Sequence, residues 1–384
     1  MQQSHRNTIP FLLLLAGSQT AMAANNAHMH GKPTEFPAVT GHLDLVQHVD
    51  RVHNATEAEE EIDEAYIHAH GEGQLWFSES LTLNTAVKLE GHPFGESGHS
   101  HGAGGGSGGD RWWEEHELKI EELNLAWQGD RFGIYGGKFN PVVGLDVHSA
   151  PGIYGYQVFE AYEIAGRVGA GANVRFDGGD YGKHQLDISR FRADRSELSR
   201  TWITKENPLS HADGGVANTS GFSSWAISLG GSGFYSYDLN KAWLEGFSYR
   251  LGYAKQAKGV DGEKDEKRWT VGLEQKFTLA DWNGMAVAEV MDIDHLGGEA
   301  AHDRRYTTLG LDLQHGRWSV GGSYTVIDNN AEEADENHDG HILQLSIAYQ
   351  LYPGMEVALG VKDSEQDAEA RDRIGLALRW DMHL

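Results

Sequence analysis

The last twelve residues, RIGLALRWDMHL (373–384), decide the fold class of this chain. Apolar side chains occupy every second position: Ile374, Leu376, Leu378, Trp380, Met382 and Leu384. Arg373, Arg379, Asp381 and His383 lie between them. Because side chains alternate between the two faces of a strand, this segment has one apolar and one polar face. Such alternation over about ten residues is typical of a β-strand that crosses a membrane.

The same alternation recurs along the chain. It predicts strands near 41–49, 65–71, 75–90, 117–128, 131–139, 162–176, 183–193, 222–232, 246–257, 267–279, 285–293, 304–315, 317–328, 341–351, 355–363 and 373–384. That is about sixteen strands, and closed single-chain bacterial barrels have an even number. We therefore expect an all-β fold, a transmembrane antiparallel β-barrel over residues 41–384.

The connections between these segments alternate in length. Short ones fall at 71–73, 129–130, 177–182, 280–284, 315–316 and 352–354, with a longer one at 233–245. Long, polar and acidic ones fall at 50–64, 91–116, 140–161, 194–221, 258–266, 294–303, 329–340 and 364–372. This order predicts short periplasmic turns and long outer loops. A soluble β-sandwich or β-helix is the alternative, but it would not sort its connections in this way.

The N-terminus has the pattern of a secretory signal peptide over residues 1–23. His5 and Arg6 precede an apolar run over residues 9–16, and Ala21-Met22-Ala23 forms a small-residue cleavage site. Residues 24–40 would then form a periplasmic N-terminal segment. The alternatives are an uncleaved anchor or a buried strand, although the apolar run is short for a membrane-spanning helix, which needs about 20 residues.

Composition and charge exclude several classes of protein. The chain has no cysteine, so neither disulfides nor thiolate chemistry is available. Its formal net charge of -26 argues against nucleic acid as a partner, because phosphate binding needs clusters of Lys and Arg. Acidic loops suit a surface that stays in solution and attracts cations.

The polar faces of the predicted strands supply candidate pore-lining residues. They are Arg167, Arg175, Arg250, Arg268, Arg317, Arg373, Arg379, Glu122, Glu274 and Asp312. An interior that carries both signs of charge suits a water-filled channel. The alternative is a closed lumen in which these charges pair, but a sixteen-stranded barrel is too wide for side chains to fill.

Residues 121–144, EELNLAWQGDRFGIYGGKFNPVVG, resemble a strand-turn-strand segment of Gram-negative outer-membrane porins, including the phosphate-selective type. The last strand resembles the assembly signal of outer-membrane proteins, although it ends in Leu384 instead of an aromatic residue. The resemblance implies an integral outer-membrane protein, a homotrimer, and a third outer loop (140–161) that folds inward to narrow the pore. Asp146 and His148 of that loop are the candidate constriction residues.

Histidine is concentrated outside the apolar strand faces. The second outer loop and its end contain His92, His99, His101 and His116 beside several carboxylates. Neutral imidazoles with carboxylates suit Zn, Ni or Cu, so weak binding of a transition metal is one hypothesis for this loop. A flexible polar loop is the other, and the sequence implies no further cofactor.

These features together predict a porin that allows passive diffusion of small polar solutes or ions across the lipid bilayer. The alternatives are a channel biased toward divalent metal cations or anions, and a barrel without a channel, such as an enzyme or an adhesin. The sequence contains no nucleophile motif of the G-x-S-x-G kind, so we do not expect an enzyme.

Overall fold

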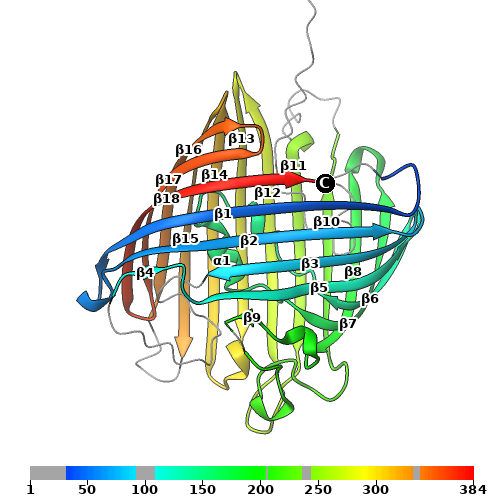
Figure 1. Ribbon diagram of the computed structural model, residues 1–384. Helices are drawn as coiled ribbons and strands as arrows, with labels where there is room; N and C mark the ends of the chain where they lie inside the picture. The colour runs from blue at the N-terminus through cyan, green and yellow to red at the C-terminus, as the bar shows by residue number, and fades with distance from the viewer. Residues whose placement is uncertain (1–31, 92–108, 205, 236–243, 332–337) are drawn as a thin grey trace, which may run out of the picture.

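A computed structural model describes residues 32–91, 109–204, 206–235, 244–331 and 338–384. The predicted signal peptide lies outside these residues. The described part of the chain forms sixteen long antiparallel strands, as the alternation predicted (Figure 1). These strands are β1 (Ala38–Ala55), β2 (Asp63–Trp76), β3 (Leu81–Gly91), β5 (His116–Gln128), β6 (Phe132–Phe139), β7 (Arg167–Asp177), β8 (Lys183–Ala193), β10 (Ser224–Ser232), β11 (Phe247–Gln256), β12 (Glu266–Leu279), β13 (Trp282–Asp294), β14 (His302–His315), β15 (Trp318–Ala331), β16 (Gly340–Tyr352), β17 (Met355–Gln366) and β18 (Glu369–His383).

The remaining elements are short. They are strands β4 (Arg111–Trp112) and β9 (Trp202–Ile203), helix α1 (Gly155–Glu160), and the 3-10 turns η2 (Ala58–Glu60), η3 (Val147–Ser149), η4 (Gly179–Tyr181), η5 (Glu197–Ser199), η6 (His211–Asp213) and η8 (Leu296–Gly298). Among the described residues, no helix is long and apolar enough to cross a membrane.

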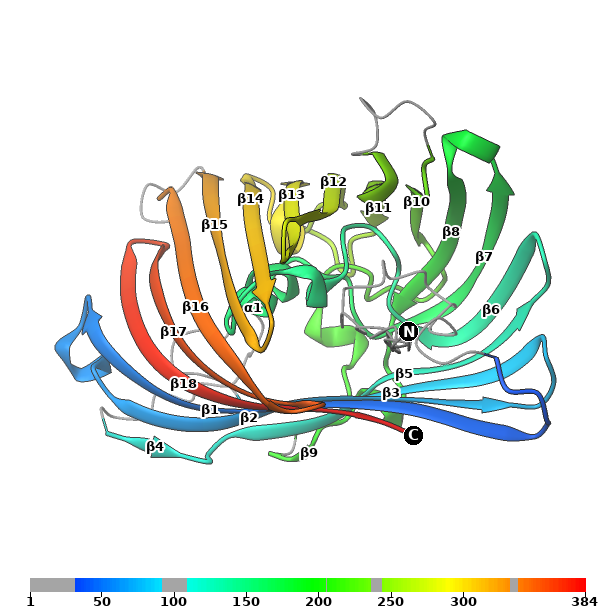
Figure 2. The same ribbon diagram turned by 90° about the horizontal axis from the view of Figure 1, so that it is seen from above.

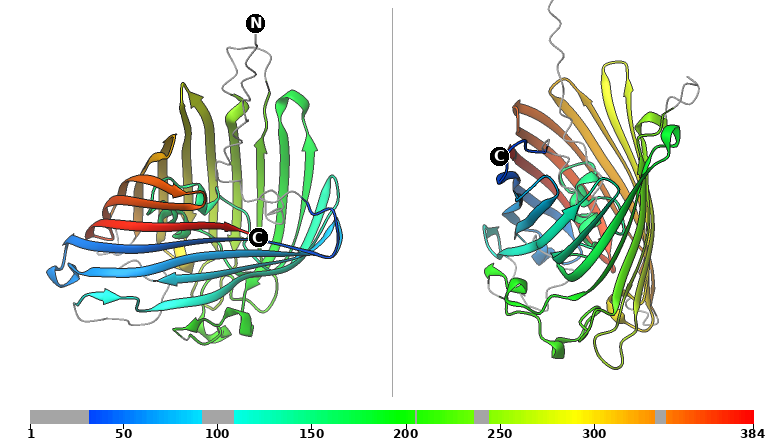
Figure 3. Two further views of the ribbon diagram at one scale, coloured as in Figure 1. Left: turned by 45° about the horizontal axis from the view of Figure 1, so that its top comes forward. Right: turned by 90° about the vertical axis from the view of Figure 1, so that its right-hand side faces the viewer.

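The strands close into a ring. Each long strand pairs with the next one along the chain, and β18 returns to pair with β1 from His42–His383 to Ala55–Arg371. Strands β1 to β3 run across the strands of the opposite wall, and the ring surrounds an interior that contains α1 (Figures 2 and 3). Opposite walls cross in this way because barrel strands tilt by about 35–45° to the axis.

The two faces of the strands differ in exposure, as the period of two predicts. In β16, Leu345 is 53% exposed, whereas its neighbour Gln344 is fully buried. In β18, Ile374 and Leu376 are exposed, whereas Arg373 on the other face is buried. The apolar residues therefore form an outer surface suited to lipid, and the polar residues point inward.

Several predicted connections differ from the structure in position or length. Residues 71–73 are not a turn: Gly71 and Gly73 pair with Val87 and Thr85 inside the β2–β3 ladder, and the turn lies at 77–80. Glycine within a strand misled the prediction, because it marks a turn only when the pairing also ends there.

The first and last outer loops are shorter than predicted. The strands β1 and β2 extend into the range 50–64, so that the first loop covers only residues 56–62. The last loop, predicted over 364–372, is the two-residue hairpin Asp367-Ala368. Both residues have positive φ values, 50° and 65°, as a tight hairpin turn between twisted strands requires.

Candidate functional site

The third outer loop folds into the barrel. It covers residues 140–166, between β6 and β7, and carries η3 and α1. Seen from above, α1 lies within the ring of strands (Figure 2). The loop is longer than the predicted 140–161, because residues 162–166 pack as part of it and β7 begins only at Arg167.

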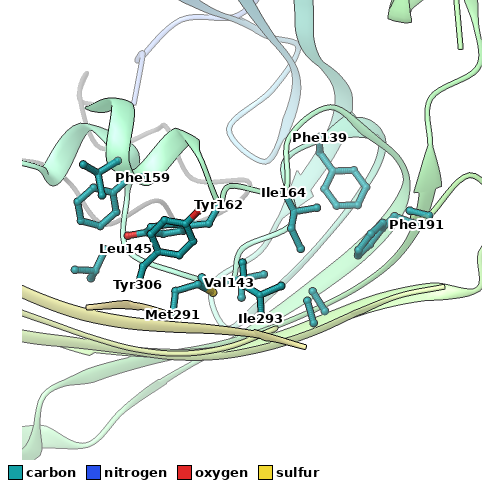
Figure 4. Packing of buried hydrophobic residues seen from close by; sticks show 14 of the residues in the cluster. Phe139, Val143, Leu145, Phe159, Tyr162, Ile164, Phe191, Met291, Ile293 and Tyr306 are labelled. Carbon is teal, nitrogen blue, oxygen red and sulfur yellow. The ribbon is translucent and has the colours of Figure 1, made fainter. Parts of the chain in front are cut away.

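One wall of the barrel holds this loop through apolar contacts. Leu145, Phe159, Tyr162 and Ile164 of the loop belong to a buried cluster with inward residues of β13 and β14 (Figure 4). The wall contributes Met291, Ile293 and Tyr306, all at most 4% exposed. Burial of each large apolar side chain stabilises the docked loop by about 1.5–3 kcal/mol.

Hydrogen bonds fix the loop on the same side of the lumen. The carboxylate of Glu289 on β13 accepts from the backbone N–H of Leu145 at 2.6 Å and from the hydroxyl of Tyr162 at 2.9 Å. The guanidinium of Arg268 on β12 donates to the carbonyl of Tyr162 at 2.5 Å. Both Glu289 and Arg268 thereby gain a partner in the loop backbone.

A second set of hydrogen bonds holds the loop farther around the ring, at β16. The side-chain amide of Gln344 donates to the carbonyl of Pro151 and to Ser323 Oγ, and its oxygen accepts from the N–H of Tyr154 at 3.3 Å. Gln344 thus holds the start of α1 against the wall.

On the far side of the lumen the contacts include ion pairs. The ammonium of Lys88 on β3 lies 2.6 Å from Glu160 at the end of α1 and 3.2 Å from Glu90. Lys119 on β5 pairs with Glu90 at 2.9 Å. In the ring of sixteen, seven strands separate β3 from β13 in either direction, so the loop spans the lumen between opposite walls.

A cavity of about 140 Å³ lies between the loop and the β2–β5 wall. Its charged and polar lining is rich in carboxylates. The acidic lining residues are Glu72, Glu121, Glu122, Asp146, Glu160 and Glu163, and the basic ones are Lys88, His68 and His70. Six acids therefore face one lysine and two histidines, and a water-filled space with this lining favours cations.

Two consecutive glutamates point into this cavity because β5 contains a bulge. The pairing with β3 shifts between Ala86–Glu122 and Val87–Ile120, so that Glu121 is the extra residue. Glu121 lies 3.4 Å from His70 Nε2, and Glu122 accepts from the N–H of Asn140 at 3.1 Å. The period of two predicted Glu122 to be inward and missed Glu121, since a bulge turns an extra residue to the same side.

Burial changes the acidity of the loop carboxyls. It raises the pKa of Glu163 to about 8, and the neighbouring negative charge of Glu121 adds to the effect. Burial also raises the pKa of Glu160, and the opposing charge of Lys88 limits the rise. Near neutral pH, part of the negative charge at the cavity is therefore switchable by proton uptake.

The predicted pore-lining residues are distributed around the lumen and do not form one cluster. Arg250 is buried against Ser228, Arg167 donates to Gln256 at 2.9 Å, and Arg175 donates to the carbonyl of Gly129. Glu274 lies 3.3 Å from Lys276, and Asp312 is half-buried on the inward face of β14.

Two further predicted arginines of β18 bind acids on the neighbouring strands β1 and β2. Arg373 pairs with Glu64, and Arg379 makes two bonds to Asp44 at 2.8 and 2.9 Å. Arg317 differs from the prediction: it lies in the exposed turn between β14 and β15, because β15 begins at Trp318, one residue later than its pattern suggested.

The remaining predicted residues have separate positions. Asp146 lines the cavity, whereas the side chain of His148 lies outside the described part of the structure. His92, His99 and His101 also lie outside the described residues. His116 is the first residue of β5, is buried, and its Nε2 accepts from the N–H of Ile67 at 2.9 Å. That nitrogen is therefore already engaged within the barrel wall.

The fold is that of Gram-negative outer-membrane porins. OprB of Pseudomonas putida is similar with a TM-score of 0.58 at 11% identity, over 90% of this chain and 94% of that one. An anion-selective porin from Comamonas acidovorans has a TM-score of 0.51 at 11% identity, and OccK1 of Pseudomonas aeruginosa has 0.51 at 8%. Both alignments cover 90% of this chain and 99% of the other. No protein-family model and no curated protein sequence matches the chain.

Proposed function

We propose that this protein is a water-filled channel of the outer membrane that allows diffusion of small polar solutes and prefers cationic ones. The observation that carries the proposal is the inward loop, which crosses the lumen and leaves an acidic cavity against the β2–β5 wall. A solute that passes this level of the barrel would meet six carboxyl groups, one lysine and two histidines.

The preference for cations follows from the electrostatic field at the level of the inward loop. A low-dielectric wall focuses the field of the carboxylates into the remaining space and raises the local concentration of cations. The inward arginines elsewhere in the barrel contact carboxylates or polar groups, as Arg373 and Arg379 do with Glu64 and Asp44, which reduces their attraction for anions.

A planar lipid bilayer with a KCl gradient tests both parts of the proposal. We expect single channels with a reversal potential on the cation-selective side. Replacement of cavity carboxylates by Glu122→Gln and Asp146→Asn should move the reversal potential toward zero. The matched control Glu79→Gln changes an exposed acid in the β2–β3 turn and should leave it unchanged.

Two results would overturn the proposal. Folded protein that gives no conductance would exclude a channel. Anion selectivity that the cavity variants do not change would assign the pore field to the inward arginines instead.

A further inference from the structure

A second group of metal-ligating side chains lies at the seam where the barrel closes. His42 near the start of β1 pairs directly with His383 at the end of β18, and Asp44 pairs with Asp381 in the same register. The period of two places all four on one face of the sheet, which is the inward face. The closure of the ring thus brings together residues from the two ends of the chain.

The ligand atoms converge on one point. His42 Nε2 lies 3.2 Å from Asp381 Oδ1, and His383 Nε2 lies 3.0 Å from the same oxygen. The two imidazole rings stack with centroids 4.8 Å apart and an angle of 22° between their planes. One ligand atom from each residue lies within 4.8 Å of the other two.

These distances fit a small divalent ion. A tetrahedral ion with bonds of about 2.0–2.1 Å to imidazole nitrogen and carboxylate oxygen holds its ligand atoms about 3.3–3.4 Å apart. Two histidines and one carboxylate are a donor set that suits Zn²⁺ and related transition metals. Small side-chain rotations of the stacked rings would complete the site.

The carboxylates around this group also favour a divalent cation. Asp44 is held by two hydrogen bonds from Arg379, so it does not compete as a ligand. Glu72 on β2 is the direct strand partner of His42 and places a further carboxylate beside it. The side chains of His42, Asp381 and His383 are 12%, 18% and 43% exposed, so an ion can reach them from solution.

The other His-carboxylate group in the described residues is less suited to an ion. His68, Glu90 and Glu160 also lie close together, but the ammonium of Lys88 contacts both carboxylates. The ammonium of Lys88 therefore already lies where a metal ion would bind that group. At the seam, Arg379 binds Asp44, and Asp381 contacts the two imidazoles.

We propose that His42, Asp381 and His383 bind a divalent transition-metal ion that links the first and last strands at the periplasmic end of the barrel. The site is independent of the proposed channel function. An ion bound across the seam stabilises the folded barrel, because it binds the closed ring and not the unfolded chain.

Calorimetry with ZnCl₂ on the purified, folded full chain tests this proposal. The background carries His92→Ala, His99→Ala and His101→Ala, so that these three imidazoles of the second outer loop cannot bind the metal. We expect one Zn²⁺ per chain in this background and a zinc-dependent rise in the unfolding temperature. His42→Ala or His383→Ala should weaken binding by at least about 100-fold, since even the loss of an outer-sphere partner of a metal costs about 10–100-fold.

The matched control is His53→Ala, an exposed histidine on the same strand β1, and it should bind Zn²⁺ as the background does. Asp381→Asn keeps the shape of the site and removes a charge, so it tests the carboxylate without loss of packing. Co²⁺ gives a second measurement, because its visible absorption reports tetrahedral ligation directly. The proposal is overturned if the background binds no Zn²⁺, or if His42→Ala and His383→Ala bind it as tightly as His53→Ala.

Discussion

The β13–β14 wall and the β2–β5 wall of the lumen hold the same loop by different means. Met291, Ile293 and Tyr306 bury apolar surface against the loop on the first wall. On the second wall, Lys88 pairs with Glu160 of the loop, and Lys119 pairs with Glu90 beside it. Apolar burial depends little on salt or pH, whereas ion pairs weaken when charges are screened or titrated. The comparison indicates a loop that is fixed on one side and adjustable on the side that faces the solute.

The largest effect should come from the apolar wall. Phe159→Ala removes a buried ring from the cluster, and truncation of a buried Phe costs about 3–5 kcal/mol. The loop should then leave the wall, raise single-channel conductance and speed hydrogen exchange over residues 140–166. Phe132→Ala, an exposed residue of β6, is the control. Unchanged conductance in Phe159→Ala would show that the charged wall alone holds the loop.

A smaller effect is expected from the charged wall. Lys88→Met leaves Glu90 and Glu160 without their shared cation, and an unpaired buried polar group costs about 1–3 kcal/mol. Cation selectivity in bilayer recordings should rise, while conductance changes less than in Phe159→Ala. Lys183→Met removes an exposed lysine at the start of β8 and should change neither quantity. If Lys88→Met changes the conductance more than Phe159→Ala does, the charged wall and not the apolar wall is the main anchor of the loop.

The cavity at the β2–β5 wall should also respond to pH. Because the pKa of Glu163 is raised to about 8, its carboxyl is neutral at pH 6 and gains charge as the pH rises toward 9. Cation selectivity should therefore increase over this range. A raised pKa means that the docked loop favours the protonated acid, so docking should weaken over the same rise in pH.

Glu163→Gln stays neutral and should remove this pH dependence from both the reversal potential and the hydrogen exchange of the loop. If the reversal potential of Glu163→Gln depends on pH as that of the native protein does, another titratable group controls the electrostatic field in the cavity. The change is confined to the loop, where Glu163 accepts from Asn140 Nδ2 at 3.1 Å.

The smallest effect should come from salt. An increase from 0.1 M to 1 M KCl shortens the screening length from about 10 Å to about 3 Å. Cation preference should fall, because the cavity carboxylates then act over a shorter range. Hydrogen-exchange protection at Tyr162 and Ile164 should stay constant, since apolar contacts hold them. Loss of protection there in high salt would mean that ion pairs also stabilise the apolar side.

Much of the fold could be predicted because strand alternation is a local property. The outward positions of Leu345, Ile374 and Leu376 follow from their own segments and need no knowledge of neighbours. The turn between β2 and β3 could not be placed, because Gly71 and Gly73 look like turn residues until their partners Val87 and Thr85 are known.

The candidate site was less predictable. Lys88 lies at a position that the period of two turns inward, so the sequence contained that signal. Glu121 had no such signal, since only the pairing of β5 with β3 reveals the bulge. The apolar inward residues of β13 and β14 contradict the rule of a polar lumen, and they become intelligible only with the loop packed on them.

The sequence by itself determined a sixteen-stranded antiparallel barrel with one apolar face per strand, because the pleat imposes a period of two on every segment. Only the tertiary structure decided which inward residues meet. Loop docking joined Glu160 to Lys88 across the lumen, and ring closure set His42 beside His383 from the other end of the chain. Such contacts depend on strand order, register and loop path, which are properties of the closed ring and not of any single segment.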